Sequence, residues 1–121
     1  MRKILIIDDD QRNIFALSAT LKQKEFTCLG ALYAESGIEI LERENDISVV
    51  MLDMMMPETD GFELIGILRK NERYKKIPII AVTAKAMPGD REKCIQSGAD
   101  DYISKPIDVD TMFAILDHYT K

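Results

Sequence analysis

The sequence predicts an α/β protein in which a doubly wound parallel sheet is covered by helices on both faces. Short apolar runs that are typical of strands alternate with stretches that have helical spacing, and this predicts five strands and five helices. Two of the runs, residues 4–7 and 49–52, are almost continuously hydrophobic, as the strands of a buried parallel sheet are. Right-handed connections between such strands place helices on both sides of one sheet.

The first half of the chain is expected to supply three strands, at Lys3–Ile7, Thr27–Ala31 and Ser48–Asp53. Helices are expected to connect them. In the first connection, Ile14, Leu17 and Leu21 recur at the spacing of one helical face.

The second half is expected to supply two more strands, at Ile77–Thr83 and Asp101–Ser104. A helix is predicted after Gly61, where the apolar stripe consists of Phe62, Ile65 and Leu68. Another is predicted over Pro88–Ser97, with the proline in its first turn and Gly98 just beyond its end.

The clearest helical pattern closes the chain. Apolar residues at i, i+3, i+4 and i+7 follow Asp108, which is placed as the N-cap. They are Val109, Met112, Phe113 and Leu116.

Length and composition restrict the class of protein. A chain of 121 residues, 46% hydrophobic, is expected to form one domain over residues 1–121. The net charge of -5 and the dispersed basic residues argue against direct nucleic-acid binding. No apolar stretch approaches the roughly 20 residues of a membrane span, and the first strand leaves no room for a signal peptide. Cys28 and Cys94 lack metal-ligand spacing. We therefore expect reduced thiols and a cytoplasmic location, without membrane insertion.

Polar residues collect where the predicted strands end, which is the edge at which open α/β sheets place chemistry. They are Asp8, Asp9 and Asp10 after the first strand, Asp53 at the end of the third, Thr83 at the end of the fourth, and Lys105 after the fifth. Neighbouring carboxylates raise each other's pKa unless a cation compensates them. Oxygen ligands without a nearby histidine favour Mg²⁺, or Mn²⁺, over zinc.

These residue types suit phosphoryl transfer. A carboxylate beside Mg²⁺ can attack an activated phosphoryl group and form an acyl phosphate, while a lysine and a threonine hydroxyl contact the phosphoryl oxygens. The single histidine, His118, is interpreted as a solvated residue near a helix end. The run Met54-Met55-Met56 is interpreted as strand-edge packing rather than a soft-metal site.

Taken together, the motifs resemble the receiver domain of two-component response regulators over essentially the whole chain. The matching segments are Ile7-Asp8-Asp9, Asp53-x-x-Met56-Pro57-x-x-Asp60-Gly61, Val82-Thr83-Ala84, Gly98-Ala99-Asp100-Asp101-Tyr102 and Lys105-Pro106. The resemblance implies a flavodoxin-like (βα)5 sandwich with the strand order 2-1-3-4-5.

The resemblance also implies a role for each residue of the site. Asp53 would be the phosphoacceptor, and Asp8, Asp9 and the backbone carbonyl of Met55 would complete the metal ligands with it. Thr83 and Lys105 would contact the phosphoryl group, and the Lys105–Pro106 peptide bond would be cis.

A two-state switch is implied as well. Thr83 would move toward the phosphoryl group and the ring of Tyr102 would change rotamer, altering a surface over residues 86–119. The implied partner is a histidine kinase or a histidine phosphotransfer protein, with an effector of unspecified kind. We expect a signalling domain with no separate substrate, as a monomer or weak dimer. Segments at Asn13-Ile14 and at 83–91 look similar to the receivers of hybrid histidine kinases.

Two positions at the rim of the site are expected to affect hydrolysis of the acyl phosphate. They are Met55, two residues after Asp53, and Lys85, two residues after Thr83. A methionine cannot orient water, so we expect Met55 to shield the acyl phosphate.

The sequence leaves three other interpretations to compare with a phosphoacceptor domain. A phosphatase of the haloacid dehalogenase type would use Asp8-x-Asp10, Thr83, Asp100-Asp101 and a lysine, but its lysine should precede the paired aspartates, whereas Lys105 follows them. A flavodoxin-like flavin binder needs a phosphate loop where this chain has an acidic cluster. A receiver that serves only for docking would normally lack one of the pocket residues.

Overall fold

The computed structural model describes residues 2–57, 60–84 and 88–121, and strands alternate with helices throughout. The elements are β1 (Arg2–Ile7), α1 (Gln11–Lys22), β2 (Phe26–Ala31), α2 (Ala34–Arg43), β3 (Ile47–Asp53), α3 (Gly61–Lys70), β4 (Ile79–Thr83), α4 (Asp90–Ser97), β5 (Asp101–Ser104) and α5 (Val109–Tyr119). The predicted α/β fold class is confirmed.

The five strands form one parallel sheet in the order β2-β1-β3-β4-β5. This is the order implied by the resemblance to receiver domains. It places β3 in the middle of the sheet with β1 and β4 on its two sides. The carboxyl end of β3 therefore lies between the carboxyl ends of its two neighbours.

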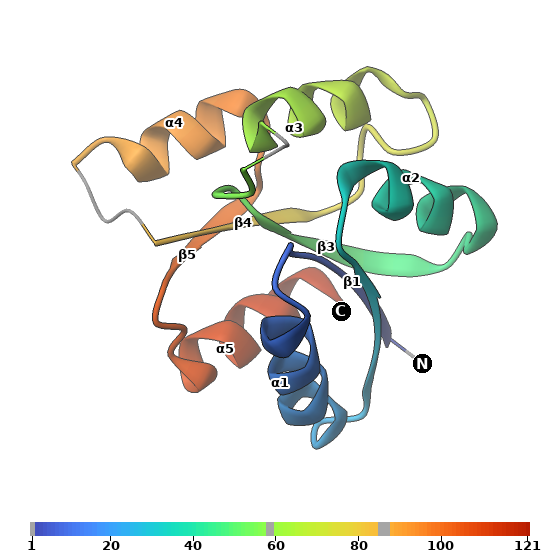
Figure 1. Ribbon diagram of the computed structural model, residues 1–121, viewed down its shortest axis with the longest axis vertical. Helices are drawn as coiled ribbons and strands as arrows, with labels where there is room; N and C mark the ends of the chain where they lie inside the picture. The colour runs from blue at the N-terminus through green and yellow to red at the C-terminus, as the bar shows by residue number, and fades with distance from the viewer. Residues whose placement is uncertain (1, 58–59, 85–87) are drawn as a thin grey trace.

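The sheet separates two hydrophobic cores, because alternate residues of a strand point to opposite faces. In Figure 1, α1 and α5 cover one face, and α2, α3 and α4 cover the other. Leu5, Val50 and Leu52 pack with the helices of the second group. Ile4, Val49 and Met51 pack with Leu21 of α1 and Leu116 of α5. Each of these side chains is almost fully buried.

Three helices begin at an aspartate whose side chain accepts a backbone N–H of the first turn. These N-caps are Asp10 for α1, Asp60 for α3 and Asp108 for α5. Such a bond satisfies a donor that the helix itself leaves unpaired. The prediction of Asp108 as an N-cap is confirmed.

Gly61 follows one of these caps at a place where only glycine fits without rearrangement. A Cβ on Gly61 would lie 2.6 Å from Sδ of Met54. The helix start therefore packs directly against the residue that follows Asp53.

Three predicted strands begin one residue earlier than expected, at Arg2, Phe26 and Ile47, and two other elements begin two residues later. The strand expected to begin at Ile77 begins at Ile79, because the N–H of Ile77 donates to the carbonyl of Tyr74 in a turn and Pro78 has no N–H to donate. The helix expected to begin at Pro88 begins at Asp90. Gly89, at φ 91°, precedes it, so the proline lies outside the first turn.

Gly98 ends α4 in the left-handed conformation, at φ 119°, as its place in the sequence predicted. A Cβ at this position would lie 2.9 Å from Cγ of Arg69 on α3. The close approach joins the end of α4 to the neighbouring helix.

Arg69 connects three segments that are distant in sequence. Its guanidinium donates to the carbonyl of Gly98 at 2.8 Å, to the carbonyl of Ile77 at 2.7 Å and to Oδ2 of Asp100 at 2.7 Å. Oδ2 of Asp100 also accepts the N–H of Ile79 at 2.8 Å. This network ties the end of α4 and the approach to β5 to α3 and the start of β4.

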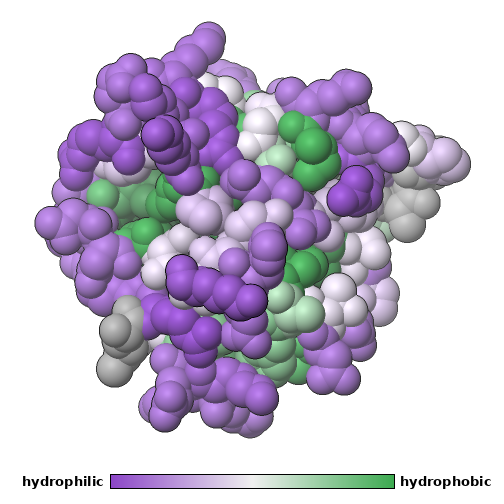
Figure 2. Space-filling view, turned by 180° about the vertical axis from the view of Figure 1, so that it is seen from behind, coloured by the Kyte–Doolittle hydropathy of each residue, from purple (hydrophilic) through white to green (hydrophobic). Residues whose placement is uncertain are grey.

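The face of the molecule seen in Figure 2 is mainly hydrophilic. Figure 2 shows one face on which hydrophobic areas appear only as separate patches between polar side chains. Phe15 on α1 is the most exposed of the large hydrophobic residues described, at 76%. Among the described residues, no helix has the length and apolar character needed to cross a membrane.

Candidate functional site

Three carboxylates meet at the carboxyl edge of the sheet. The pairing of Ile7 with Leu52 places the residue after β1 beside the last residue of β3. One oxygen from each of Asp8, Asp9 and Asp53 lies within 4.8 Å of the other two. Asp8 is 4% exposed and Asp53 is 5% exposed, whereas Asp9 is on the surface. The sequence pattern predicted this cluster, and the order of the strands produces it.

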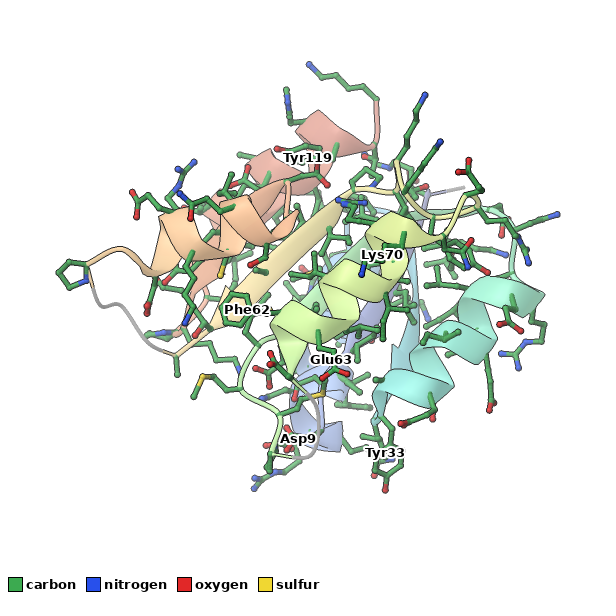
Figure 3. The ribbon with its side chains drawn as sticks, turned by 90° about the horizontal axis from the view of Figure 1, so that it is seen from above. Asp9, Tyr33, Phe62, Glu63, Lys70 and Tyr119 are labelled. Atoms are coloured by element: carbon green, nitrogen blue, oxygen red, sulfur yellow. The ribbon has the colours of Figure 1, made fainter. Side chains whose placement is uncertain are left out.

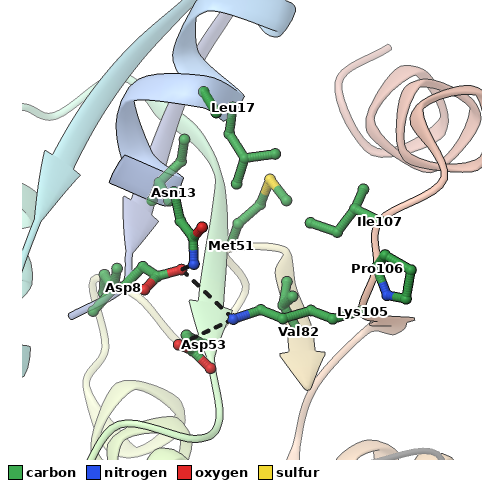
Figure 4. Close-up of a pocket in the computed structure, with 12 residues that line it drawn as sticks. Asp8, Asn13, Leu17, Met51, Asp53, Val82, Lys105, Pro106 and Ile107 are labelled. Carbon is green, nitrogen blue, oxygen red and sulfur yellow. Dashed lines mark hydrogen bonds and ion pairs between the residues drawn. The ribbon is translucent and has the colours of Figure 1, made fainter. Parts of the chain in front are cut away.

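Lys105 reaches the cluster from the other side. Its Nζ lies 3.4 Å from Oδ2 of Asp53 and 3.9 Å from Oδ2 of Asp8, as Figure 4 shows. The backbone N–H of Lys105 donates to the carbonyl of Thr83 at 2.8 Å, which ties the segment after β5 to the end of β4. The Lys105–Pro106 peptide bond is cis, as the resemblance implied.

Backbone donors hold both buried carboxylates in place. The N–H of Met55 donates to Oδ1 of Asp53 at 2.9 Å, and the N–H of Asp10 donates to Oδ1 of Asp8 at 2.9 Å. Each bond closes a short turn directly after a strand. The backbone N–H of Met55 therefore lies beside Asp53, while the residue as a whole is 42% exposed.

Burial raises the pKa of Asp8 above its ordinary value, since the charged form loses solvation. The hydrogen bond from Asp10 opposes this shift, and the negative charge of Asp53 adds to it. Lys105 lowers the pKa by its positive charge, but the net shift remains upward. A further cation at this site would relieve the cost of keeping Asp8 ionised.

Asp10 has a different role from its two acidic neighbours. Its carboxylate caps α1 and makes an ion pair with Arg12 at 3.2 Å. The hydrogen bonds from Arg12 hold the pKa of Asp10 below its usual range. The sequence placed Asp10 at the same edge of the sheet, but the structure shows a helix cap outside the group of three.

Thr83 ends β4 next to the acidic cluster. It follows Val82, which pairs with Asp53, and it is 4% exposed. The hydroxyl-bearing residue expected at this edge is therefore adjacent to the strand of Asp53. The other rim position, Lys85, lies outside the described residues.

Tyr102 lies on β5 and packs against the core on the side of α2, α3 and α4. Burial raises the pKa of its hydroxyl, and Asp90 and Cys94 raise it further when they are ionised. Both of these groups belong to α4. Tyr102 therefore packs on the side of the sheet that α4 covers, where Cys94 belongs to the same core.

A cavity of about 230 Å³ extends from the acidic cluster between α1 and the segment after β5. Its walls are largely apolar, with Leu17, Met51 and Ile107 among them (Figure 4). Asn13 also lines it and donates from Nδ2 to Oδ2 of Asp8 at 3.4 Å. The sequence did not place Asn13 in the site, although a position three residues after the N-cap faces back toward the start of a helix.

The donor set fits a hard divalent cation. All three acidic residues offer oxygen, two of them are buried, and backbone N–H groups hold the buried pair in position. Mg²⁺ is bound in proteins through one or two carboxylates with water completing its octahedron. Asp9, at the exposed side of the cluster and at the edge of the sheet in Figure 3, leaves room for such water.

The chain belongs to the response regulator receiver domain family, which it matches over residues 4–117. Receiver domains are signalling domains of two-component systems, and phosphorylation and Mg²⁺ binding at an acidic pocket are general features of the family. This membership favours a receiver domain over the phosphatase and flavin-binding interpretations of the sequence.

Individual relatives agree with this assignment. The chain is 32% identical to the polar-differentiation response regulator DivK of Brucella abortus over 120 residues, covering 98% of this chain and 95% of DivK. It is 35% identical to an uncharacterized 14.6 kDa protein of Leptolyngbya boryana over 116 residues, covering 96% of this chain and 88% of that protein.

Solved structures show the same fold. The chemotaxis protein CheY4 of Vibrio cholerae superposes with a TM-score of 0.89 at 24% identity, covering 98% of both chains. The receiver domain of a sensor histidine kinase of Pseudomonas aeruginosa superposes with a TM-score of 0.87 at 28% identity, covering 98% of this chain and 97% of that one. A magnesium ion is coordinated in the active-site cleft of that receiver domain.

Proposed function

We propose that this receiver domain accepts a phosphoryl group on Asp53 from a phosphohistidine of a histidine kinase or a histidine phosphotransfer protein. Asp8, Asp9, Asp53 and the backbone carbonyl of Met55 would hold Mg²⁺, with Mn²⁺ as a substitute. The location consistent with this role is the cytoplasm. The phosphorylated domain would then act on an effector.

One observation carries this proposal. Asp53 is a nearly buried carboxylate that has an ammonium group 3.4 Å from one oxygen and two further carboxylates within 4.8 Å. A carboxylate that served only to pair with Lys105 would not need two more acids beside it. The excess negative charge is what a metal-dependent phosphoacceptor requires.

In the proposed transfer step one bond to phosphorus forms as another breaks. An oxygen of the Asp53 carboxylate attacks phosphorus and forms the O–P bond, while the N–P bond of the phosphohistidine breaks and its electron pair returns to the imidazole. The ammonium of Lys105 stabilises the negative charge on the phosphoryl oxygens, and the hydroxyl of Thr83 donates to one of them. Bound Mg²⁺ supplies further charge neutralisation at those oxygens.

The output of the domain would come from the β4–α4–β5–α5 surface. Tyr102 pairs with Ala81, two residues before Thr83, so Thr83 and Tyr102 share one face of two neighbouring strands. A movement of the threonine toward a phosphoryl group would open space on the side of the tyrosine. The phosphoryl group adds charge at a fixed position and so favours one of two arrangements.

Intact-protein mass spectrometry after incubation with Mg²⁺ and acetyl phosphate tests the proposal. The wild type should gain one phosphoryl group only in the presence of metal, and Asp53→Asn should gain none. Asp10→Asn is the matched control, because that carboxylate caps α1 outside the cluster, and it should be phosphorylated normally.

Two results would contradict the proposal. A gain that survives in Asp53→Asn would identify another nucleophile. No gain with acetyl phosphate or with a phosphorylated histidine donor, in a protein that binds Mg²⁺, would indicate a receiver that serves only for docking.

A further inference from the structure

Asn13 contacts the same carboxylate oxygen that Lys105 approaches. Its Nδ2 donates to Oδ2 of Asp8 at 3.4 Å, and Nζ of Lys105 lies 3.9 Å from that oxygen. Figure 4 shows the two groups approaching Asp8 from α1 and from the segment after β5. The proposed phosphoryl transfer gives no role to this asparagine.

The contact helps to fix the orientation of Asp8. Oδ1 accepts the backbone N–H of Asp10 at 2.9 Å, and Oδ2 accepts the side-chain amide of Asn13. A carboxylate with a donor on each oxygen cannot rotate freely about its Cβ–Cγ bond. Both donors are neutral, so neither cancels the negative charge of an ionised Asp8.

The ammonium group of Lys105 lies near two carboxylates. It is closer to Asp53, at 3.4 Å, than to Asp8, at 3.9 Å. An ammonium group is a mobile point charge on a flexible stem, and it would pair more closely with Asp8 if the oxygen facing it lacked another donor. The Asn13 amide supplies that donor.

We infer that Asn13 is a positioning residue that satisfies Asp8 and thereby keeps Lys105 directed at Asp53. This inference rests on the proposed function for the identity of the metal and of the phosphoacceptor. Without the amide, Lys105 moves toward Asp8 and competes with the metal for that carboxylate. Groups that orient metal ligands in this way typically change metal affinity about 10-fold to 100-fold when they are removed.

The dissociation constant of Mg²⁺, measured by calorimetry without any phosphodonor, tests this role. Asn13→Leu has a similar size but no amide, and we expect it to weaken Mg²⁺ binding about 10-fold. Gln11→Leu removes an exposed amide from the same turn of α1 and should leave the affinity unchanged. Circular dichroism confirms folding, and Asn13→Ala replaces Asn13→Leu if the latter does not fold.

A double-mutant cycle with Lys105→Met separates positioning from a purely structural effect. If Lys105 is the competitor, Asn13→Leu should weaken Mg²⁺ binding clearly less in the Lys105→Met background than in the wild type. An equal loss in both backgrounds would refute the competition. An unchanged dissociation constant in Asn13→Leu would refute the inference while leaving the proposed function intact, whereas no binding by the wild type would refute the metal site itself.

Discussion

Replacing Arg69 by methionine should destabilise the protein strongly although Arg69 is remote from the acidic cluster. Methionine keeps most of the aliphatic stem and removes the guanidinium that joins α3, the start of β4 and the end of α4. Three of its hydrogen bonds are 2.8 Å or shorter, to the carbonyls of Gly98 and Ile77 and to the carboxylate of Asp100.

The size of the effect follows from these three bonds. Each contributes about 1 kcal/mol net. The bond to Asp100 is assigned no more than the other two, because the Asp100 side chain is 39% exposed and its charge is screened. The expected loss in the free energy of unfolding is therefore about 3 kcal/mol. For a domain of this size that loss lowers Tm by roughly 10 to 15 °C.

Urea denaturation followed by circular dichroism measures this change. Lys70→Met is the matched control, because Lys70 is the exposed neighbour of Arg69 on α3. It should change the free energy of unfolding by no more than about 0.5 kcal/mol. A loss below about 1 kcal/mol for Arg69→Met would show that the network does not hold these segments together.

The remaining predictions concern the acidic site. In metal-free protein, Asp8→Asn should raise the free energy of unfolding at pH 7. The raised pKa of Asp8 means that the folded state binds more protons than the unfolded state above the ordinary value of 3.8, so stability falls as pH rises through that window. The gain should disappear below pH 3.8, and a pH-independent gain would show that it does not come from the burial of a charged Asp8. Mg²⁺ at 100 times the dissociation constant of the wild type should raise the free energy of unfolding of the wild type by about 2.7 kcal/mol. An equal rise in Asp8→Asn at the same Mg²⁺ concentration would exclude Asp8 as a ligand. Met55→Asn should speed loss of the phosphoryl group severalfold in a mass-spectrometric time course, and an unchanged or slower rate would show that Met55 does not shield it.

Local patterns in the sequence were sufficient to predict the elements and most of the acidic site. Hydrophobic periodicity depends only on neighbouring residues, so the alternation of strands and helices could be read directly. Asp53 stood out because a carboxylate ends a buried apolar run. The family resemblance supplied the strand order, and the structure shows that this order brings Asp8, Asp9 and Asp53 together.

Other features depended on the tertiary structure, since they arise from contacts between segments that are distant in sequence or from competition between equivalent residues. Asp8 and Asp10 follow the same strand, but only the folded chain shows that one joins the site and the other caps a helix. Arg69 looks like an ordinary surface charge until α4 and β5 are placed beside it. Asn13 gains its role only because α1 lies over the end of β1, where its amide and Lys105 approach the same oxygen. Such arrangements depend on geometry through space, which a linear pattern does not encode.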